Sequence, residues 1–459
     1  MATKLKVLSF ENCWNIIRTP DFYGCPNLEK LNFKWCKDLR KISGSIGKLK
    51  CLIDLRIYSY NSLKHLPEEI GDLVNLQYFV VDCYKIKRLP NFIGKLKSLC
   101  ELHFKGCISH NLDSANSWNL PCVIEMLHNH SLKDRLPSGI GSLPLLRILN
   151  LSGTCVSEVP KTISMLPCLQ RIELMGCNNI QELPTLPTSL THLEVSSKLL
   201  RVVSDLSNLT NLVELYLSGT HVSEVPKTIG TLPRLQRIKS IRCDTIQELP
   251  TLPTSLTLLE VSSKSLPVVL DLSNLTNLIE LHLVDYGKVR DKLCTNELGW
   301  IGKLSKLTKL TVGLHNALVP IEMASLPVLN KLLLFGFNQQ TFPQLPLSLE
   351  RLRLGNFNSA VSLSPNLRNL LCLELYNSPM QEIQLDGLQL PQLKELRVEG
   401  WQHLERLRLS RMRKLNDVNV NLCMKLVEIQ FSWVFESLEA LDIGDGESLE
   451  RIVYESIMN

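Results

Sequence analysis

Residues 28–57 read LEKLNFKWCKDLRKISGSIGKLKCLIDLRI, and this stretch contains the pattern that decides the fold. It opens with Leu-x-x-Leu-x-Phe at Leu28, and the same spacing returns as Leu-x-x-Leu-x-Ile at Leu52. The alternation at the end of each motif has a period of two residues, which is typical of a short strand with one buried face. The sequence therefore predicts two strands that occupy equivalent places in successive units.

The same spacing recurs along the whole chain. Repeats start at residues 5, 28, 52, 76, 99, 123, 146, 169, 190, 212, 235, 256, 278, 307, 329, 349, 370, 393, 415 and 438. Most starts are roughly 20–24 residues apart, a period typical of leucine-rich repeats. Such units bury their apolar face only against their neighbours. We therefore predict an α/β solenoid over residues 1–459: a single leucine-rich-repeat domain of about 20 repeats, a horseshoe with a parallel β-sheet on its concave face.

The second half of many repeats follows the pattern Leu-Pro-x-x-Ile-Gly-x-Leu, as at Leu66, Leu89 and Leu136. Proline lacks an N–H group and fixes φ, so this segment cannot continue a sheet. Units this short also leave little room for a full helix. We expect turns and short 3-10 pieces on the convex face.

The ninth position of many repeats carries a small polar side chain. It is Cys at 13, 36, 107, 177, 243 and 423, and Thr at 154 and 220. Such a side chain can turn inward and bond backbone groups that would otherwise be buried and unpaired. No Cys-x-x-Cys pair or His partner accompanies these cysteines, so we expect a structural role and no bound metal.

Three features depart from the regular pattern. Residues 108–135 form an irregular repeat, with a degenerate start at Val123, and residues 287–297 form an extended repeat loop. Residues 146–211 recur at 212–277, with roughly three-quarters of the positions identical. The differences cluster near the strand at 173–176 and 239–242, where altered binding specificity and neutral drift are both open interpretations. Ser240 replaces a core apolar residue there, which should weaken packing.

Composition excludes several classes of protein. The formal net charge is +5 over 459 residues, which gives no reason to expect a nucleic-acid partner. No signal peptide follows Met1, and no apolar run approaches the length of a membrane span. We therefore read the fifteen cysteines as reduced thiols and expect a cytoplasmic location, with the nucleus as an alternative.

Residues 15–67 resemble the leucine-rich repeats of plant TIR-class nucleotide-binding (TIR-NBS-LRR) disease resistance proteins. The shared segments are Thr19-Pro20-Asp21-Phe22, Pro26-Asn27-Leu28-Glu29, Cys36 and Ser45-Ile46-Gly47. The Leu-Pro-x-Leu-Pro-x-Ser-Leu runs at 183–190, 249–256 and 342–349 (beginning Phe-Pro in the last) are also similar to that class. The resemblance implies recognition of pathogen proteins and contact with a nucleotide-binding domain. No Gly-x-x-x-x-Gly-Lys loop is present, so the family's nucleotide switch does not transfer, and we expect a receptor fragment or a repeat-only relative.

Positions three, five, seven and eight of each repeat should face outward on the concave side. The candidate protein-binding residues in these columns are Lys30, Lys34, Trp35, Arg56, Tyr58, Tyr78, His103, Lys105, Tyr216, Arg237, Lys239, Arg242, Arg351, Arg353, Tyr376, Glu395 and Arg397. Exposed aromatic side chains beside arginine are typical of protein interfaces. We expect a pathogen effector, a guarded host protein or a nucleotide-binding domain as partner. Trp401 occupies a ninth position, where a buried side chain is equally consistent with the pattern.

No nucleophile elbow, metal-ligand pair or clustered acid pair is present, so we expect no catalytic residues and no cofactor. Two alternatives remain open at this point. One is an intracellular leucine-rich-repeat scaffold or adaptor in signalling, of the Ras-group or ubiquitin-ligase type. The other is an extracellular receptor, suggested only by four glycosylation sequons of the kind that often occur by chance.

Overall fold

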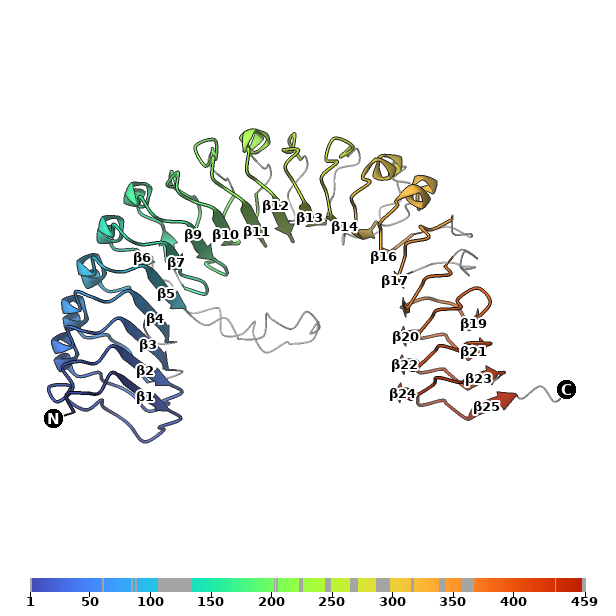
Figure 1. Cartoon of the computed structure of the whole chain (residues 1–459), viewed down its shortest axis with the longest axis horizontal. Helices are drawn as coiled ribbons and strands as arrows, with labels where there is room; N and C mark the ends of the chain where they lie inside the picture. Colours follow the sequence, from blue (N-terminus) through green and yellow to red (C-terminus); the bar gives the residue numbers. More distant parts are fainter. Residues whose placement is uncertain are drawn as a thin grey trace. The chain divides into compact units, whose positions relative to one another are not determined.

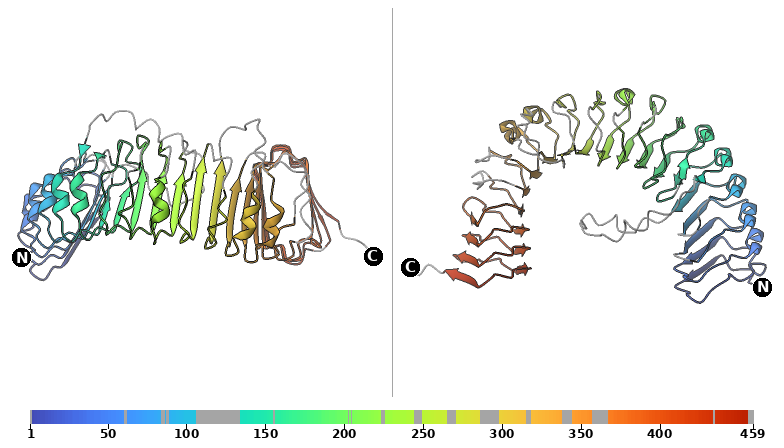
Figure 2. Two further views of the ribbon diagram at one scale, coloured as in Figure 1. Left: turned by 90° about the horizontal axis from the view of Figure 1, so that it is seen from above. Right: turned by 180° about the vertical axis from the view of Figure 1, so that it is seen from behind.

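The computed structural model describes residues 2–59, 62–83, 86, 89–105, 134–154, 156–201, 203, 205–222, 226–243, 249–264, 271–285, 298–314, 318–337, 344–356, 367–433 and 435–455. The chain divides into two compact units, Met1–Pro253 and Thr254–Asn459. In both units parallel strands of successive repeats lie side by side, with the connecting segments behind them (Figures 1 and 2). The predicted leucine-rich-repeat solenoid is confirmed.

The first unit contains one long parallel sheet. Its strands are β1 (Val7–Glu11), β2 (Lys30–Lys34), β3 (Asp54–Ser59), β4 (Tyr78–Cys83), β5 (Glu101–Lys105), β7 (Ile148–Asn150), β9 (Arg171–Leu174), β10 (His192–Ser196), β11 (Glu214–Ser218) and β12 (Arg237–Ile241). Each strand pairs with the next in this order. Such a ladder satisfies the backbone N–H and C=O groups of every inner strand.

The sheet passes directly from β5 to β7, because Glu101 pairs with Ile148 and Leu102 with Leu149. The expected irregular repeat at 108–135 lies outside the described residues except for its last two. These form β6 (Asp134–Arg135), which pairs with β8 (Val156–Glu158) in a separate two-stranded sheet.

The second unit contains two parallel sheets. The first continues the repeat pattern with β13 (Leu258–Ser263), β14 (Glu280–Asp285), β15 (Lys309–Gly313), β16 (Lys331–Phe335), β17 (Arg351–Gly355), β18 (Cys372–Tyr376), β20 (Glu395–Glu399), β22 (Asp417–Asn421) and β24 (Ala440–Gly444). The second consists of β19 (Glu382–Asp386), β21 (Arg406–Ser410), β23 (Glu428–Ser432) and β25 (Arg451–Glu455). The expected extended loop 287–297 lies outside the described residues.

The second sheet corrects the expectation of turns and 3-10 pieces throughout the far side of the repeats. The four segments contain no proline, and the first three alternate apolar with polar residues, as in Glu-Ile-Gln-Leu-Asp at 382–386. Ile383, Leu385, Leu407, Leu409, Ile429 and Phe431 are buried. A period of two residues without proline favours a strand here, as it does in the first sheet.

Each strand of the long sheets begins two residues after a predicted repeat start, for every start within the described residues. Positions one, four and six point inward: Leu28, Leu31 and Phe33 are all at most 1% exposed, and the equivalent residues of most repeats are buried. The apolar area buried between neighbouring repeats is the main stabilising term, at roughly 1.5–3 kcal/mol for each large side chain.

Short 3-10 helices occupy the far side of many repeats, as the Leu-Pro-x-x-Ile-Gly-x-Leu pattern predicted. They are η1 (Gly44–Lys48), η2 (Glu68–Asp72), η3 (Asn91–Lys95), η6 (Ser138–Ser142), η7 (Lys161–Met165), η8 (Lys227–Thr231), η9 (Leu298–Lys303) and η10 (Ile321–Ser325). In η2 the proline is the N-cap, Ile70 is buried, and Leu73 closes the helix through its N–H to the Ile70 carbonyl. The glycine of the pattern allows close stacking, since a Cβ at Gly47 would lie 2.7 Å from the Glu69 carbonyl oxygen.

A left-handed residue ends many strands at position eight of the repeat. Residues with positive φ at this position are Asn12, Trp35, Gly153, Gly176, Gly219, Arg242, Gly336, Asn356, Asn377, Gly400, Leu422 and Asp445. This turn directs the ninth side chain inward, where the predicted cysteines form hydrogen bonds with backbone carbonyls, apart from Cys107, which lies outside the described residues. Cys36 Sγ lies 3.6 Å from the Phe10 oxygen of the previous repeat, and Cys177 Sγ lies 3.1 Å from that of Leu151.

Candidate functional site

The outward side chains at positions three, five and seven of the long-sheet strands form a surface that we call the strand face. All seventeen predicted residues lie on it or at its edge. Fifteen are within strands, while Trp35 and Arg242 directly follow β2 and β12. None of them is buried. The structure thus places the predicted residues on the expected side of the sheet, and their role in binding remains a prediction.

The first repeats bring some of these residues into direct contact. Lys34 Nζ lies 2.9 Å from the Glu11 carboxylate of β1 and 4.1 Å from the centroid of the Trp35 ring. Arg56 Nε donates to Asp54 of its own strand at 2.9 Å. Trp35 is 37% exposed, and its backbone has the left-handed conformation. A bulky residue rarely adopts that conformation, which costs roughly 1–2 kcal/mol.

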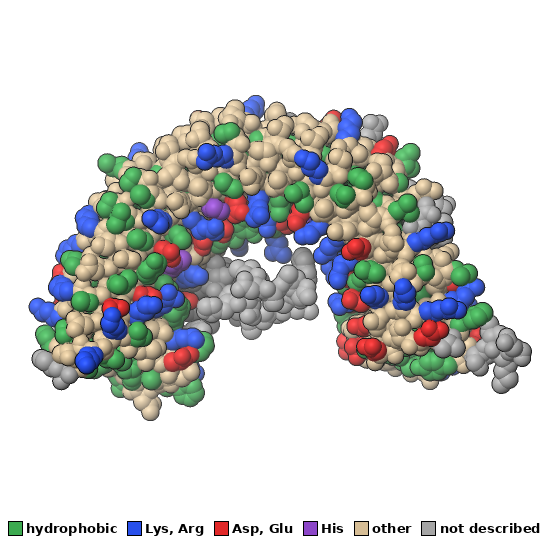
Figure 3. Space-filling model, viewed as in Figure 1, with side chains coloured by type: hydrophobic (Ala, Val, Ile, Leu, Met, Phe, Trp, Pro, Cys, Tyr) green, Lys and Arg blue, Asp and Glu red, His purple; other side chains and the backbone are tan. Residues whose placement is uncertain are grey.

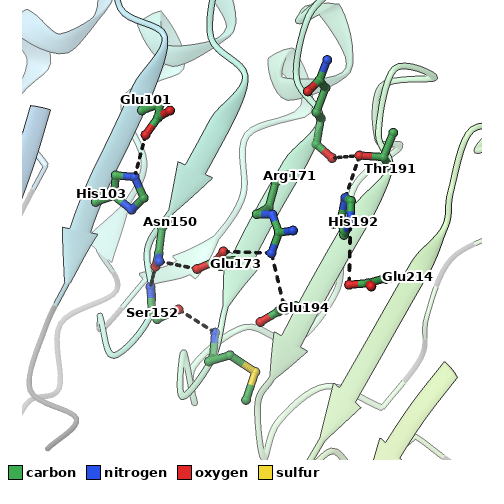
Figure 4. A network of polar contacts seen from close by, with 12 residues as sticks. Glu101, His103, Asn150, Ser152, Arg171, Glu173, Thr191, His192, Glu194 and Glu214 are labelled. Atoms are coloured by element: carbon green, nitrogen blue, oxygen red, sulfur yellow. Dashed lines mark hydrogen bonds and ion pairs between the residues drawn. The ribbon is translucent and has the colours of Figure 1, made fainter. Parts of the chain in front are cut away.

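A polar network covers the middle of the first unit, across β5 to β11 (Figure 4). Asn150 donates to Glu173, and Arg171 lies 3.5 Å from Glu173 and 3.7 Å from Glu194. On the next strands, His192 lies 3.6 Å from Glu214. Arg171 and His192 thus each lie beside glutamates of their own or the neighbouring strand.

The electrostatics of this network are strained at one point. Glu194 faces Glu173 directly in the β9–β10 register, and like charges in such a pair repel. Burial raises the pKa of the Glu194 carboxyl, and the Glu173 carboxylate raises it further. Burial also lowers the pKa of His192, with a contribution from Arg171. Both pKa changes favour the neutral forms of Glu194 and His192.

The β11–β12 part of the strand face carries predicted residues of a different character. Arg237 Nη1 lies 2.8 Å from Glu214 Oε1, and Tyr216 faces Lys239 in the register. Arg242 follows directly, is exposed, and has a φ of 54°. This strand pair therefore presents an aromatic ring among three cationic side chains.

In the second unit, Arg353, Tyr376 and Glu374 form one compact group on β17 and β18. Arg353 Nη2 donates to the Tyr376 hydroxyl at 2.5 Å, its Nε lies 2.8 Å from Glu374, and its guanidinium lies 4.3 Å from the Tyr376 ring centroid. Arg397 lies 3.9 Å from Glu395 on β20. Figure 3 shows Lys and Arg gathered on the strand side of this unit before a more acidic region toward the C-terminus.

Cys372 is the first residue of β18, at position three of its repeat, and lies between Arg351 of β17 and Glu395 of β20 in the register. Burial, Glu374 and Glu395 together raise the pKa of its thiol to about 12. The thiol is therefore protonated at neutral pH and is a poor nucleophile.

Apart from Glu395, the residues predicted from sequence include none of the acidic side chains of the site. Glu173, Glu194, Glu214 and Glu374 occupy the same columns as the predicted cations and tyrosines. Column position alone would have found them, but their pairing depends on the register between repeats. Trp401, at a ninth position, is 4% exposed and belongs to the core.

Neither a cluster of metal ligands nor a membrane-spanning helix is found among the described residues. No group of three His, Cys, Asp or Glu side chains in these ranges could hold a metal ion. In the same ranges, no helix combines the length and the apolar character needed to cross a bilayer.

The duplicated blocks 146–211 and 212–277 differ most on the strand face. Five of the nine face positions differ, but only one of the nine core positions one, four and six. Elsewhere in the blocks, 11 of 48 positions differ. The altered face positions are Ile148/Glu214, Asn150/Tyr216, Glu173/Lys239, Met175/Ile241 and His192/Leu258.

Comparison with known proteins gives this surface a context. No protein-family model matches the chain. TMV resistance protein N of Nicotiana glutinosa is 34% identical over 168 residues, which cover 35% of this chain and 14% of that protein. Disease resistance-like protein DSC1 of Arabidopsis thaliana is 29% identical over 177 residues, with 36% and 14% covered. The chain is a leucine-rich-repeat relative of plant disease resistance proteins.

These resistance-protein relatives belong to the TIR-NBS-LRR class, so the resemblance inferred from sequence is confirmed. The aligned region spans only about one seventh of the curated relatives it matches. Among solved structures, the Leptospira interrogans LRR protein LIC12759 has a TM-score of 0.52 at 21% identity, covering 96% of this chain and 92% of that one. The Drosophila Toll–Spatzle complex gives 0.58 at 16%, covering 90% and 61%. Identities this low support the fold alone.

Proposed function

We propose that this resistance-protein relative is a non-catalytic recognition module whose strand face binds a protein in the plant defence response. The observation that carries the proposal is the duplication, in which the strand face has changed at five of nine positions while the core has changed at one. Neutral drift would spread substitutions over all exposed positions. A surface that adapts to different partners would concentrate them where the partner sits.

The partner we propose is a pathogen effector or a guarded host protein, met in the cytoplasm. The similarity to disease resistance proteins supports a role in disease resistance. The structural neighbour Toll is seen in complex with Spatzle, and this supports a protein partner for the fold. In a longer receptor, the same face would contact the nucleotide-binding domain, and partner binding would compete with that contact and shift the population of states.

A site-specific cross-linking experiment tests this proposal without knowledge of the partner. The photoreactive amino acid benzoylphenylalanine replaces Tyr58, Tyr216 or Tyr376 on the strand face. Matched controls carry it at Met165 in η7 and Ile321 in η10, which are 71% and 73% exposed on the other side of the repeats. We expect protein adducts, in plant cells challenged with a pathogen, from the tyrosine positions only. Adducts confined to the 3-10 side would refute the proposal.

A further inference from the structure

The strand face of β16–β18 differs from the polar network of the first unit, because half-buried apolar side chains share it with cations. We call it the platform. Its residues are Lys331, Leu333, Phe335, Arg351, Arg353 and Tyr376. Leu333 and Phe335 point outward at positions five and seven but are neither buried nor fully exposed. Large apolar groups on the solvent side of a sheet often mark an interaction site.

The two aromatic rings of the platform lie on either side of Gly355. Phe335 pairs with Gly355, and Gly355 pairs with Tyr376, so the two rings flank a residue without a side chain. A Cβ at Gly355 would lie 2.6 Å from Phe335 Cδ1, so the Phe335 ring rests on the glycine backbone. Arg353 then covers the Tyr376 ring at 4.3 Å. Phe335, Arg353 and Tyr376 thus give the platform a partly apolar surface across three strands.

The cationic part of the platform lies beside the aromatic part, at position three of the repeats. Lys331 faces Arg351 in the β16–β17 register, and both side chains are exposed. Among the residues that the structure describes, neither has an acidic side chain within ion-pair distance. Two nearby cations are different in this respect, since Lys309 of β15 is paired with Glu280 at 2.7 Å and Arg353 of β17 with Glu374. Two adjacent unpaired cations are complementary to two carboxylates.

We propose that the platform binds an acidic segment of a partner protein through two carboxylates at Lys331 and Arg351 and an apolar side chain at Leu333 and Phe335. This inference rests on the proposed function and names the chemistry of the partner at one place. Neighbouring strands are about 4.8 Å apart, and positions five and seven lie roughly 7 and 13 Å along the strand from position three. An extended segment therefore fits when its apolar residue is two to four residues from its acidic ones.

Nucleic acid is the competing occupant, because bases stack on aromatic rings beside arginine. Acidic side chains on the last strand of the platform and on the two strands that follow it disfavour nucleic acid. Glu374, Glu395 and Asp417 follow on β18, β20 and β22, and their carboxylates would repel a chain of phosphates. A short peptide with two acidic groups ends before it reaches them. Charge complementarity thus selects a protein segment.

Fluorescence anisotropy with defined peptides tests the platform. The probe is a short labelled peptide in which Glu pairs alternate with Leu and Phe. One comparison peptide has Lys in place of Glu, a second has Ser in place of Leu and Phe, and a labelled oligothymidylate represents nucleic acid. We expect saturable binding of the first peptide only, weakened by salt.

Variants of the full chain locate the binding. Reversing both cations in Lys331→Glu/Arg351→Glu should weaken binding about tenfold or more. Phe335→Ser should weaken it without changing its salt dependence. The matched control Arg368→Glu/Lys425→Glu makes the same charge change at exposed positions outside the strands, and should leave binding unchanged.

Three outcomes would overturn the inference: no saturable binding of the acidic peptide, equal binding by the charge-reversed variant, or preferred binding of the Lys peptide or the oligonucleotide. The proposed function fails separately, through cross-linking. If Tyr58 and Tyr216 give protein adducts while the platform binds no acidic peptide, the strand face is still the recognition surface and only the assignment to the platform is lost.

Discussion

Ser240 offers the sharpest test of how this solenoid is stabilised. It occupies core position six in β12, is 1% exposed, and its Oγ has no hydrogen-bond partner among the described residues. It packs beside Leu217 of β11 in the register. The first copy of the duplication has Leu174 in the same place, also 1% exposed. The chain therefore contains its own reference for this position.

The magnitude follows from burial. A buried hydroxyl without a partner costs about 1–3 kcal/mol, so Ser240→Ala should raise the free energy of unfolding by roughly 1 kcal/mol. Ser240→Leu adds apolar volume worth about 0.8 kcal/mol per methylene, offset by up to about 3 kcal/mol if neighbours must move. The alanine variant is therefore the cleaner test. The reverse change, Leu174→Ser, should cost about 3–5 kcal/mol through a cavity and a new unpaired hydroxyl.

Native-state hydrogen exchange is the appropriate assay, because a repeat protein can open locally without unfolding as a whole. In Ser240→Ala, amides of β11 and β12 should exchange about five- to tenfold more slowly, with β2 and β3 unchanged. Leu174→Ser should speed exchange in β9 and β10. If Ser240→Ala exchanges as fast as the native chain or faster, the hydroxyl has a partner in solution and the reasoning is wrong.

Three further predictions concern single groups. Arg242→Gly, which restores the residue found at Gly176, should raise stability by roughly 1 kcal/mol in thermal unfolding by relieving a left-handed arginine, and a loss of stability would contradict the assigned strain. Glu194→Gln should stabilise the chain at neutral pH. The raised pKa of Glu194 means that the folded chain binds this proton more tightly than the unfolded chain does. The stability of the native chain therefore falls as the pH rises from the pKa of the unfolded state through that of the folded state. Below this pH range Glu194 is protonated in both states, and the substitution should no longer stabilise the chain. Iodoacetamide should label the exposed Cys51 at neutral pH well before the buried Cys372, as peptide mass spectrometry would show; equal rates would contradict the raised thiol pKa.

The repeat strands were predictable because their signal is local. Leu-x-x-Leu-x-Leu specifies the strand, its buried face and its outward columns within six residues, so β2 and β17 begin where expected. The 3-10 helices were predictable for the same reason, since proline and the Ile-Gly pair lie within one turn. The sequence signal of the four strands in the second sheet is equally local. They were not predicted because the Leu-Pro segments of other repeats were taken to represent the far side of every repeat.

The contacts of the candidate site depend on something that the sequence does not contain. Whether Arg171 lies between Glu173 and Glu194 depends on the register between repeats of 21 and 22 residues and on side-chain rotamers. The assignment of positions three, five, seven and eight to the outward side placed Arg351 and Arg353 correctly on one face. It did not distinguish Arg351, which has no acidic partner among the described residues, from Arg353, which is paired with Glu374. That difference decides which residue is available to a partner.

Three changes in β12 and directly after it indicate that its face has been altered at a cost in stability. Relative to the first copy, Lys239 replaces a glutamate, Ser240 removes a core leucine, and Arg242 replaces a glycine at a left-handed position. Two of the three weaken the fold by physical arguments that do not involve binding. A solenoid tolerates such losses because each repeat is stabilised by its neighbours. Residues that are retained against stability are expected where function requires them, so loss of partner binding should be sought first in β12.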